Sequence, residues 1–244
     1  MTPLIHFHHA PSAQALAQDV AEFVAHRLRE GLRERGQALL VVSGGSTPVP
    51  FFEALARCEL DWSRVVITLA DERWLPPDHA DSNARLVAAH LLQGEAARAR
   101  FVPLYNGAAT PQDGQADIEL QLAALPWSAE VVVLGMGGDG HTASLFPHAP
   151  ELPKALAGLE AEAFSQATPR CLPVAAPALP NVPVPRLTLT ARALLDARCV
   201  LLHVTGAAKW DLLQQALQSG PVAQWPVRLA LHQARVPCEV FHAD

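Results

Sequence analysis

Apolar residues recur at helical spacing between positions 12 and 35, which predicts an amphipathic helix. The apolar positions that set this spacing are Leu16, Val20, Phe23, Val24 and Leu28. Ser12 has the short polar side chain of an N-cap, and Gly36 suits the end of the helix. We therefore expect one long helix that buries a single apolar face.

Short apolar runs alternate with helical segments along much of the remaining chain. The predicted strands cover residues 38–42, 65–69, 130–134 and 199–204. The predicted helices cover residues 81–92, 111–125 and 207–217, and another helix is expected to have Pro48 in its first turn. This alternation predicts an α/β fold with a mostly parallel sheet flanked by helices. Sheets of this kind bind ligands beyond the carboxyl ends of their strands, so the candidate site lies there.

The alternation breaks down between residues 147 and 190, a stretch that contains nine prolines. Apolar residues persist through it, which favours an irregular connection within one domain over a linker between two. We find no internal repeat. The chain, residues 1–244, is therefore expected to form a single domain.

Composition and charge exclude several classes of protein. Half of the 244 residues are apolar and only 17% are charged, which argues against disorder. The 18 basic and 24 acidic residues include no basic cluster, which argues against nucleic-acid binding. We find no signal-peptide pattern and no apolar run near the ~20 residues that span a bilayer. Four widely spaced cysteines are expected to be reduced thiols. We expect a cytoplasmic protein that binds neither nucleic acid nor membranes.

The segment GMGGDGHTASLFP, residues 135–147, follows a predicted strand and is the richest in candidate chemistry. Three of its glycines match the dinucleotide-binding spacing, but Pro147 interrupts the helix that such a site requires. Asp139 and His141 suggest another use, because a histidine accepts a proton from water near neutral pH and an aspartate can orient its ring. A structural histidine beside a capping aspartate fits this short motif equally well.

A second glycine-rich loop, Ser43-Gly44-Gly45-Ser46-Thr47, follows the predicted strand at 38–42. Its backbone N–H groups, its hydroxyls and the start of the next helix are the components of a phosphate-binding loop. The spacing of a nucleotide P-loop is absent. A plain strand–turn–helix connection explains the same residues.

Charged residues stand at further strand and helix ends. Asp71, Glu72 and Arg73 follow the strand at 65–69, and Arg186 begins an Arg-Leu-Thr-Leu-Thr strand. Lys209 falls in the first turn of a predicted helix, where its charge opposes the helix dipole. A bound anion would relieve that conflict, although single cations are usually solvated surface charges.

Three histidines near the amino terminus, His6, His8 and His9, raise the question of a metal site. A strand would place His6 and His8 on one face, but no acidic or cysteine partner lies nearby in the sequence. We expect polar decoration of the terminus and no metal site.

Five segments together resemble the glucosamine-6-phosphate isomerase/6-phosphogluconolactonase family. They are SGGSTP at 43–48, DERWLPPDHADSN at 71–83, GMGGDGHTASLFP at 135–147, PRLTLT at 185–190 and TGAAKWDLL at 205–213. The resemblance runs from about residue 10 to the end of the chain. It implies a modified Rossmann-like scaffold shared with glucosamine-6-phosphate deaminases, so the fold alone does not select the reaction.

The residues after His141 resemble the lactonases more than the deaminases. Deaminases on this scaffold typically continue Asp-Gly-His with Ile-Ala-Phe-Asn-Glu-Pro, and their glutamate assists ring opening. This chain continues with Thr-Ala-Ser-Leu-Phe-Pro, residues 142–147, which contain no carboxylate. The resemblance therefore favours a lactonase.

The resemblance implies hydrolysis of 6-phospho-D-glucono-1,5-lactone to 6-phosphogluconate in the oxidative pentose phosphate pathway. It implies His141 as the general base, and the other implied catalytic residues are Asp139, Asp71 and Arg73. The implied phosphate-binding residues are Gly44, Gly45, Ser46, Thr47, Arg186 and Lys209. No metal or organic cofactor is implied, since a lactone is already activated toward water. The last residues, 236–244, match no motif and stay outside the predicted site.

The expected partner is a small-molecule phosphosugar lactone, bound by a monomer or a weak homo-oligomer. Two alternative functions stay open. One is a deaminase or another sugar-phosphate isomerase on the same scaffold. The other is a non-enzymatic sugar-phosphate sensor domain, although such sensors usually carry a basic DNA-binding helix, which we do not find in this sequence.

Overall fold

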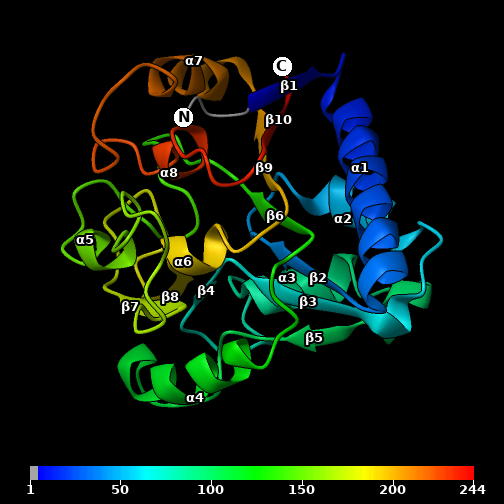
Figure 1. Cartoon of the computed structure of the whole chain (residues 1–244), viewed down its shortest axis with the longest axis horizontal. Helices are drawn as coiled ribbons and strands as arrows, with labels where there is room; N and C mark the ends of the chain where they lie inside the picture. Colours follow the sequence, from blue (N-terminus) through cyan, green and yellow to red (C-terminus); the bar gives the residue numbers. More distant parts are fainter. Residues whose placement is uncertain (1–4) are drawn as a thin grey trace.

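Seven parallel strands form the central sheet of the computed structural model, which describes residues 5–244 (Figure 1). They lie in the order β1-β10-β9-β6-β2-β3-β5. Their bounds are β1 Ile5–His9, β2 Ala38–Val42, β3 Val65–Leu69, β5 Arg100–Val102, β6 Val131–Leu134, β9 Val200–Thr205 and β10 Cys238–Ala243. After β2, the next strands β3 and β5 are added on one side of it. The chain then crosses back, and β6 and β9 are added on the other side. This reversal between β2 and β6 creates the crevice where such sheets bind ligands.

The strands at the centre of the sheet are buried on both faces. Every residue of β2, β3 and β6 is buried. Strands covered on both sides consist of continuous apolar runs, and this is why the sequence pattern located them. The predicted strands and the mostly parallel sheet are confirmed, with the third strand beginning one residue later, at 131, and the fourth shifted by one residue to 200–205.

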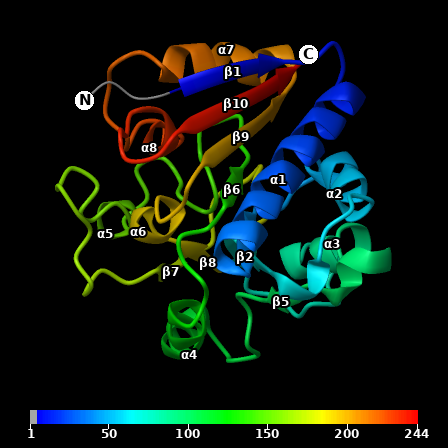
Figure 2. The same ribbon diagram turned by 45° about the vertical axis from the view of Figure 1, so that its right-hand side comes forward.

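Helices cover both faces of the sheet. The α-helices are α1 Ala13–Arg35, α2 Val49–Ala56, α3 Asn83–His90, α4 Pro111–Ala123, α5 Leu152–Ala155, α6 Ala191–Leu194, α7 Ala207–Ala216 and α8 Arg228–Leu231, with 3-10 turns η1 Trp62–Arg64 and η2 Gly94–Arg98. α1 runs along one face (Figure 2), where Phe23 packs 5.4 Å from Phe241 of β10. The next residue of β10, His242, points to the other face and stacks on Trp210 of α7 at 4.1 Å. None of the helices within residues 5–244 has the length and apolar character needed to span a bilayer.

The first helix ends where its sequence signals predict. The Ser12 side chain accepts a hydrogen bond from the backbone N–H of Ala15 at 3.2 Å. Gly36 closes the helix with φ 76°, a left-handed conformation that favours glycine, and its N–H donates to the Leu32 carbonyl at 3.1 Å. Three other helices are shorter than predicted: α3 covers 83–90, α4 covers 111–123 and α7 covers 207–216. Pro48 is the N-cap of α2 and precedes its first turn.

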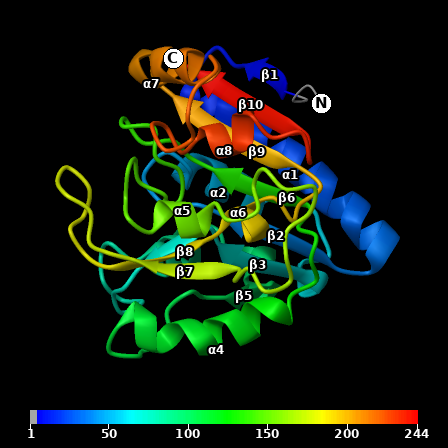
Figure 3. The ribbon, with the colours of Figure 1, turned by 60° about the vertical axis from the view of Figure 1, so that its left-hand side comes forward.

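A second, antiparallel sheet lies beside the first and was not predicted from the sequence (Figure 3). Its strands, in the order β4-β8-β7, are Asp71–Arg73, Arg186–Leu189 and Cys171–Val174. The charges at 71–73 thus form a short strand, in which Arg73 pairs with Arg186. β7 lies inside the proline-rich stretch 147–190, and only long-range pairing with β8 makes it a strand.

Glu72 shows how this short charged strand tolerates burial. Its carboxylate is inaccessible to solvent. It accepts hydrogen bonds from the backbone N–H groups of Arg73, Asn83 and Ala84 and from the Ser82 hydroxyl. Burial raises its pKa, and these backbone hydrogen bonds oppose that effect. Glu72 therefore fastens the start of α3 to β4 and has no place in the candidate site.

His6 and His8 have no acidic neighbour in the sequence, but the fold brings one to them. Strand β10 runs beside β1, and Glu239 bridges the two histidines at 2.9 Å and 2.6 Å. The partner lies more than 230 residues away in sequence, so no local pattern could reveal it. His9 in turn approaches His242, with their Nδ1 atoms 3.4 Å apart. These histidines belong to the contacts that hold the edge strand to the sheet.

Candidate active site

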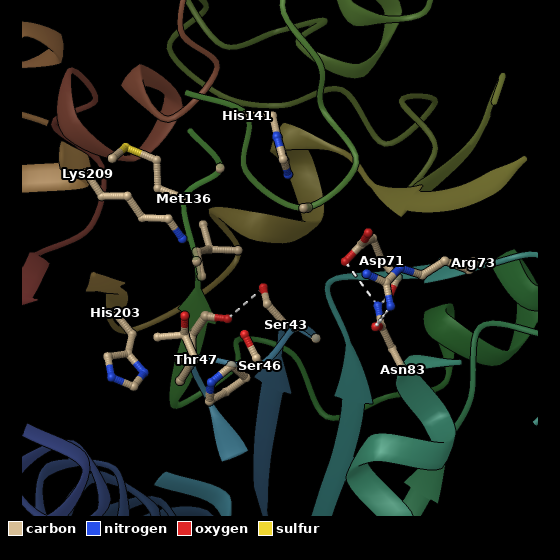
Figure 4. A pocket seen from close by; sticks show the side chains of 18 of the residues that line it. Ser43, Ser46, Thr47, Asp71, Arg73, Asn83, Met136, His141, His203 and Lys209 are labelled. Atoms are coloured by element: carbon tan, nitrogen blue, oxygen red, sulfur yellow. Dashed lines mark hydrogen bonds between the residues drawn. The ribbon is translucent and has the colours of Figure 1, made fainter. Parts of the chain in front are cut away.

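A cavity opens at the carboxyl ends of β2, β3, β6 and β9, where the strand order reverses (Figure 4). Every residue predicted for the site lines this cavity except Asp139, which reaches it through His141. The lining residues that were predicted are Gly44, Gly45, Ser46, Thr47, Asp71, Arg73, His141, Arg186 and Lys209. Segments separated by as many as 165 positions in sequence thus meet in one place.

His141 and Asp139 form a close hydrogen-bonded pair. Asp139 Oδ1 lies 2.5 Å from His141 Nδ1 and also accepts the His141 backbone N–H at 3.1 Å. Burial is the largest influence on the pKa of Asp139 and would raise it, but the hydrogen bonds and charge of His141 outweigh it, so the pKa is lowered. An ionised carboxylate only accepts hydrogen bonds, so Nδ1 carries the proton, and in the neutral imidazole the acceptor is Nε2. In that form the pair can offer a base to the cavity that His141 lines.

Glycines let the loop that carries this pair close tightly. The Gly137 N–H donates to the His141 carbonyl at 2.9 Å, and a Cβ on Gly137 would overlap the His141 imidazole. Gly140 has φ 80°, and a Cβ there would press on Trp225. The Val227 N–H donates to the Gly140 carbonyl at 2.9 Å. The turn before α8 thus supports the loop from outside, a contact that the sequence did not indicate.

Ala143 adopts a left-handed conformation with φ 48°, which is uncommon for a residue other than glycine. The residues on either side of it are both buried and both turned inward. The Thr142 hydroxyl donates to the Gly135 carbonyl at 2.8 Å, and the Ser144 hydroxyl donates to the carboxylate of Asp71. The loop is therefore tied back to β6 and also fastened to the second sheet.

Asp71 and Arg186 form a buried ion pair at the edge of the cavity. Arg186 is 4% exposed, and its Nη1 lies 3.7 Å from Asp71 Oδ2. Burial lowers the pKa of Arg186, and the Asp71 carboxylate opposes that effect. The guanidinium also lies over the Phe146 ring at 5.3 Å, and its Nη2 donates to the Val182 carbonyl at 3.1 Å. Arg186 is thus a positioned cation.

Asn83 links this charged group to the glycine-rich loop after β2. Arg73 Nη1 donates to Asn83 Oδ1 at 2.8 Å, and Asn83 Nδ2 donates to the Asp71 backbone carbonyl at 2.8 Å. A Cβ on Gly44 would overlap the Asn83 side chain, so only glycine permits this approach. Asn83 ends the 71–83 segment that resembles the family, and nothing in the sequence singled it out as a site residue.

The opposite wall carries the features of an anion site. The Lys209 ammonium points toward the cavity in Figure 4 and forms no ion pair with any residue of 5–244. Ser46 and Thr47 precede α2, whose N-cap Pro48 makes no side-chain hydrogen bond to the start of the helix. Ser43 fixes the base of this loop by donating to the Val133 carbonyl at 3.1 Å. Backbone donors, hydroxyls and an ammonium together suit a phosphate group.

The chain as a whole is similar to known proteins in sequence and in fold. The family described as glucosamine-6-phosphate isomerases/6-phosphogluconolactonase matches residues 11–238. A 6-phosphogluconolactonase of Pseudomonas aeruginosa is 49% identical, over 90% of this chain and 88% of that protein. One of Rhizobium meliloti is 44% identical over the full length of both. The crystal structure of a 6-phosphogluconolactonase from Shewanella baltica is 39% identical, covers 100% of this chain and 98% of its own, and has a TM-score of 0.89.

The packing of Gly137 against His141 gives a first prediction. In Gly137→Ala the new methyl group displaces the imidazole, so the Asp139–His141 hydrogen bond breaks. We expect the downfield proton resonance of His141 Nδ1–H to disappear from the NMR spectrum. Gly138→Ala is the matched control, because a Cβ there meets nothing within 4 Å. Retention of the resonance in Gly137→Ala would contradict this account.

A second prediction concerns His203, a buried residue of the same cavity. Burial, followed by the charge of Lys209, lowers its pKa from 6.5 to about 4. As the pH falls through this interval, the unfolded chain binds a proton here before the folded chain does, so the free energy of unfolding decreases by up to roughly 3 kcal/mol. Urea denaturation from about pH 7 to about pH 4 measures this loss. The free energy of unfolding of His203→Phe is expected to decrease less over this pH range. If wild type and His203→Phe showed the same pH dependence, the loss would not come from His203.

Proposed function

This chain belongs to the glucosamine-6-phosphate isomerase/6-phosphogluconolactonase family, and on that basis we propose that it hydrolyses 6-phospho-D-glucono-1,5-lactone to 6-phosphogluconate. The observation that carries the proposal is the Asp139–His141 pair, which leaves Nε2 free beside a cavity suited to a phosphate. The identity to 6-phosphogluconolactonases over the full chain supports the same reaction. This reaction belongs to the oxidative pentose phosphate pathway.

In the proposed mechanism His141 acts as the general base. Its Nε2 takes a proton from a water molecule as the water oxygen attacks C1 of the lactone. The negative charge of Asp139 stabilises the imidazolium that results. When the bond between C1 and the ring oxygen breaks, the imidazolium returns its proton to that oxygen. The product is an open-chain acid, and the histidine ends in its starting form.

Negative charge develops on the carbonyl oxygen as water attacks, and hydrogen-bond donors that are already in position stabilise it. Arg73 is one candidate, because Asp81 and Asn83 hold its Nη1 in place. The backbone N–H groups of the 135–138 glycine segment are the others. Asp71, which lines the cavity while bound by Ser144, is suited to orient the hydroxyls of the sugar. The reaction requires no cofactor, because water attacks a lactone carbonyl directly.

The phosphate is proposed to bind between the 43–47 loop, Lys209 and Arg186. The loop would contribute N–H groups and the hydroxyls of Ser46 and Thr47. Lys209 would act as a point charge, and the planar guanidinium of Arg186 as a directional donor. The helix dipole at the start of α7 disfavours Lys209, and a bound dianion would remove that disadvantage.

The surroundings of His141 support hydrolysis over deamination. Phe146 occupies the position at which the deaminase pattern carries a glutamate. Its ring centroid lies 4.9 Å from that of His141. A phenyl ring transfers no proton, so the second carboxylate that assists sugar ring opening in deaminases is replaced by an apolar wall. The residue at position 146, within the 135–147 segment, thus favours hydrolysis.

The central test removes the proposed base. His141→Ala is expected to lower kcat for freshly prepared 6-phosphogluconolactone by ~10²–10⁴-fold, after correction for spontaneous opening. Calorimetric binding of 6-phosphogluconate should change little, because His141 does not hold the phosphate. His26→Ala, at an exposed position of α1, is the matched control. A kcat within a few-fold of wild type would exclude His141 as the base, and ammonia release from glucosamine 6-phosphate without lactone hydrolysis would overturn the proposed reaction.

Substitution of the two cations tests the phosphate site. Lys209→Ala should raise KM by about tenfold or more with a smaller change in kcat, since it removes a charged contact to the phosphate. Arg186→Ala should raise KM and also lower the melting temperature, because it leaves the buried Asp71 carboxylate unpaired. Lys154→Ala, which changes the other lysine of the chain, is the control. An unchanged KM in both site variants would remove these residues from the phosphate site.

A further inference from the structure

The turn between α7 and α8, residues 217–227, lies against the loop that carries the proposed base, and the mechanism gives this turn no part. Two backbone hydrogen bonds join the turn to the loop. The Val227 N–H donates to the Gly140 carbonyl at 2.9 Å, and the His148 N–H donates to the Ala223 carbonyl at 3.1 Å. The loop is therefore attached to the turn both before and after the proposed base.

Trp225 of this turn covers Gly140, the residue between Asp139 and His141. A Cβ on Gly140 would lie 2.7 Å from Trp225 Cδ1 and 3.0 Å from its Cβ, so the tryptophan packs directly on the glycine backbone. The Gly140 N–H donates to the Gly137 carbonyl at 3.0 Å. The N–H, the carbonyl and one face of Gly140 are thus all held by other parts of the protein. This backbone sets how close the Asp139 and His141 side chains come, because they leave the chain on either side of it.

Arg228 in turn holds Trp225. Its guanidinium carbon lies 4.5 Å from the centroid of the Trp225 ring. The arginine is only 2% exposed, and its Nε, Nη1 and Nη2 donate to the backbone carbonyls of Ala216, Pro221 and Gln218 at 3.1, 3.1 and 3.0 Å. A planar guanidinium bound through all three nitrogens keeps one orientation, and its face stacks on an aromatic ring. The ring that covers Gly140 therefore has a fixed support of its own.

We propose that Trp225 is a positioning residue for the base: held by Arg228, it fixes the backbone of Gly140 and thereby keeps the His141 ring against Asp139. The proposal rests on the proposed function for the role of His141. Trp225 is not among the residues that line the cavity, so it acts through the loop and not on the substrate. Without the ring the loop relaxes on that side, and a displacement of ~1 Å in a reacting group can lower a rate ~100-fold.

Two substitutions at this position isolate the packing on Gly140. Trp225→Ala removes the ring, whereas Trp225→Phe keeps the Cβ, the Cγ and an aromatic edge against the glycine. We expect Trp225→Ala to lower kcat for the phosphorylated lactone by about 10- to 100-fold with KM within about twofold, because the proposed phosphate site lies elsewhere in the cavity. Trp225→Phe should recover most of the lost kcat. A raised KM with unchanged kcat in Trp225→Ala would overturn the proposal.

The downfield proton resonance of His141 Nδ1–H provides a readout that does not depend on turnover. We expect it to broaden or disappear in Trp225→Ala and to remain in Trp225→Phe. Trp127→Ala is the matched control and should retain the resonance. Trp127 is also half-buried and lies 4.3 Å from the guanidinium carbon of Arg170, but it precedes β6, at the end of the sheet opposite the cavity.

Thermal melting establishes that each variant is folded, and Arg228→Lys is a second variant should Trp225→Ala not fold. The lysine keeps the charge and removes the planar support of the ring, so the same loss of resonance and of kcat is expected in smaller measure. An unchanged resonance in the folded variants would overturn the proposal, as would its equal loss in Trp127→Ala. If wild-type protein fails to hydrolyse the lactone, the proposed function is wrong, and the resonance still decides whether Trp225 positions His141.

Discussion

The parallel pairing of β2 with β3 on one side and β6 on the other is the constraint on which the whole site depends. Parallel strands end at the same edge of a sheet, and the order reverses at β2, so the loops after β2 and β6 diverge and leave a crevice between them. The Ser43 hydroxyl, bound to the Val133 carbonyl, joins the two strands at that point. Each polar segment of the site is therefore attached to a rigid, buried strand, and the position of its side chains follows from backbone hydrogen bonds far from the solvent.

The geometry of the site also depends on two side chains that lie directly against the backbone of glycines. Gly44 admits the side chain of Asn83, and Gly137 admits the ring of His141. The first contact connects the loop after β2 with Arg73 and Asp71, while the second keeps the imidazole against Asp139. A methyl group at either glycine would separate groups that must act together. The glycine-rich character of these loops is thus a matter of space as well as of backbone conformation.

The second sheet contributes the charged side chains of Asp71, Arg73 and Arg186 to the site, and burial holds them in defined positions. Arg186 lies opposite Arg73 on neighbouring strands, and Asp71 offsets part of that repulsion. Because these groups are held before a substrate arrives, they need little rearrangement to stabilise an anionic ligand. Lys209 and His203 differ in kind from this group, since the lysine has no ion pair within residues 5–244 and the Nδ1 of the histidine has no hydrogen bond. The cavity therefore combines a preorganised charge network with an ammonium group that forms no ion pair within residues 5–244.

The sequence by itself determined the buried strands, the limits of α1 and the polar loops at the strand ends, because apolar periodicity, N-caps and glycine stops act over a few residues. The motif residues that it marked also meet around one cavity. Tertiary structure alone decided the second sheet, the bridging of His6 and His8 by Glu239, and the support of Gly140 by Trp225. It also decided the burial of His203, because a histidine within an apolar strand can be buried or exposed and the sequence of β9 does not tell which. These features depend on pairing between distant segments, and their free energy comes from contacts that no local pattern encodes.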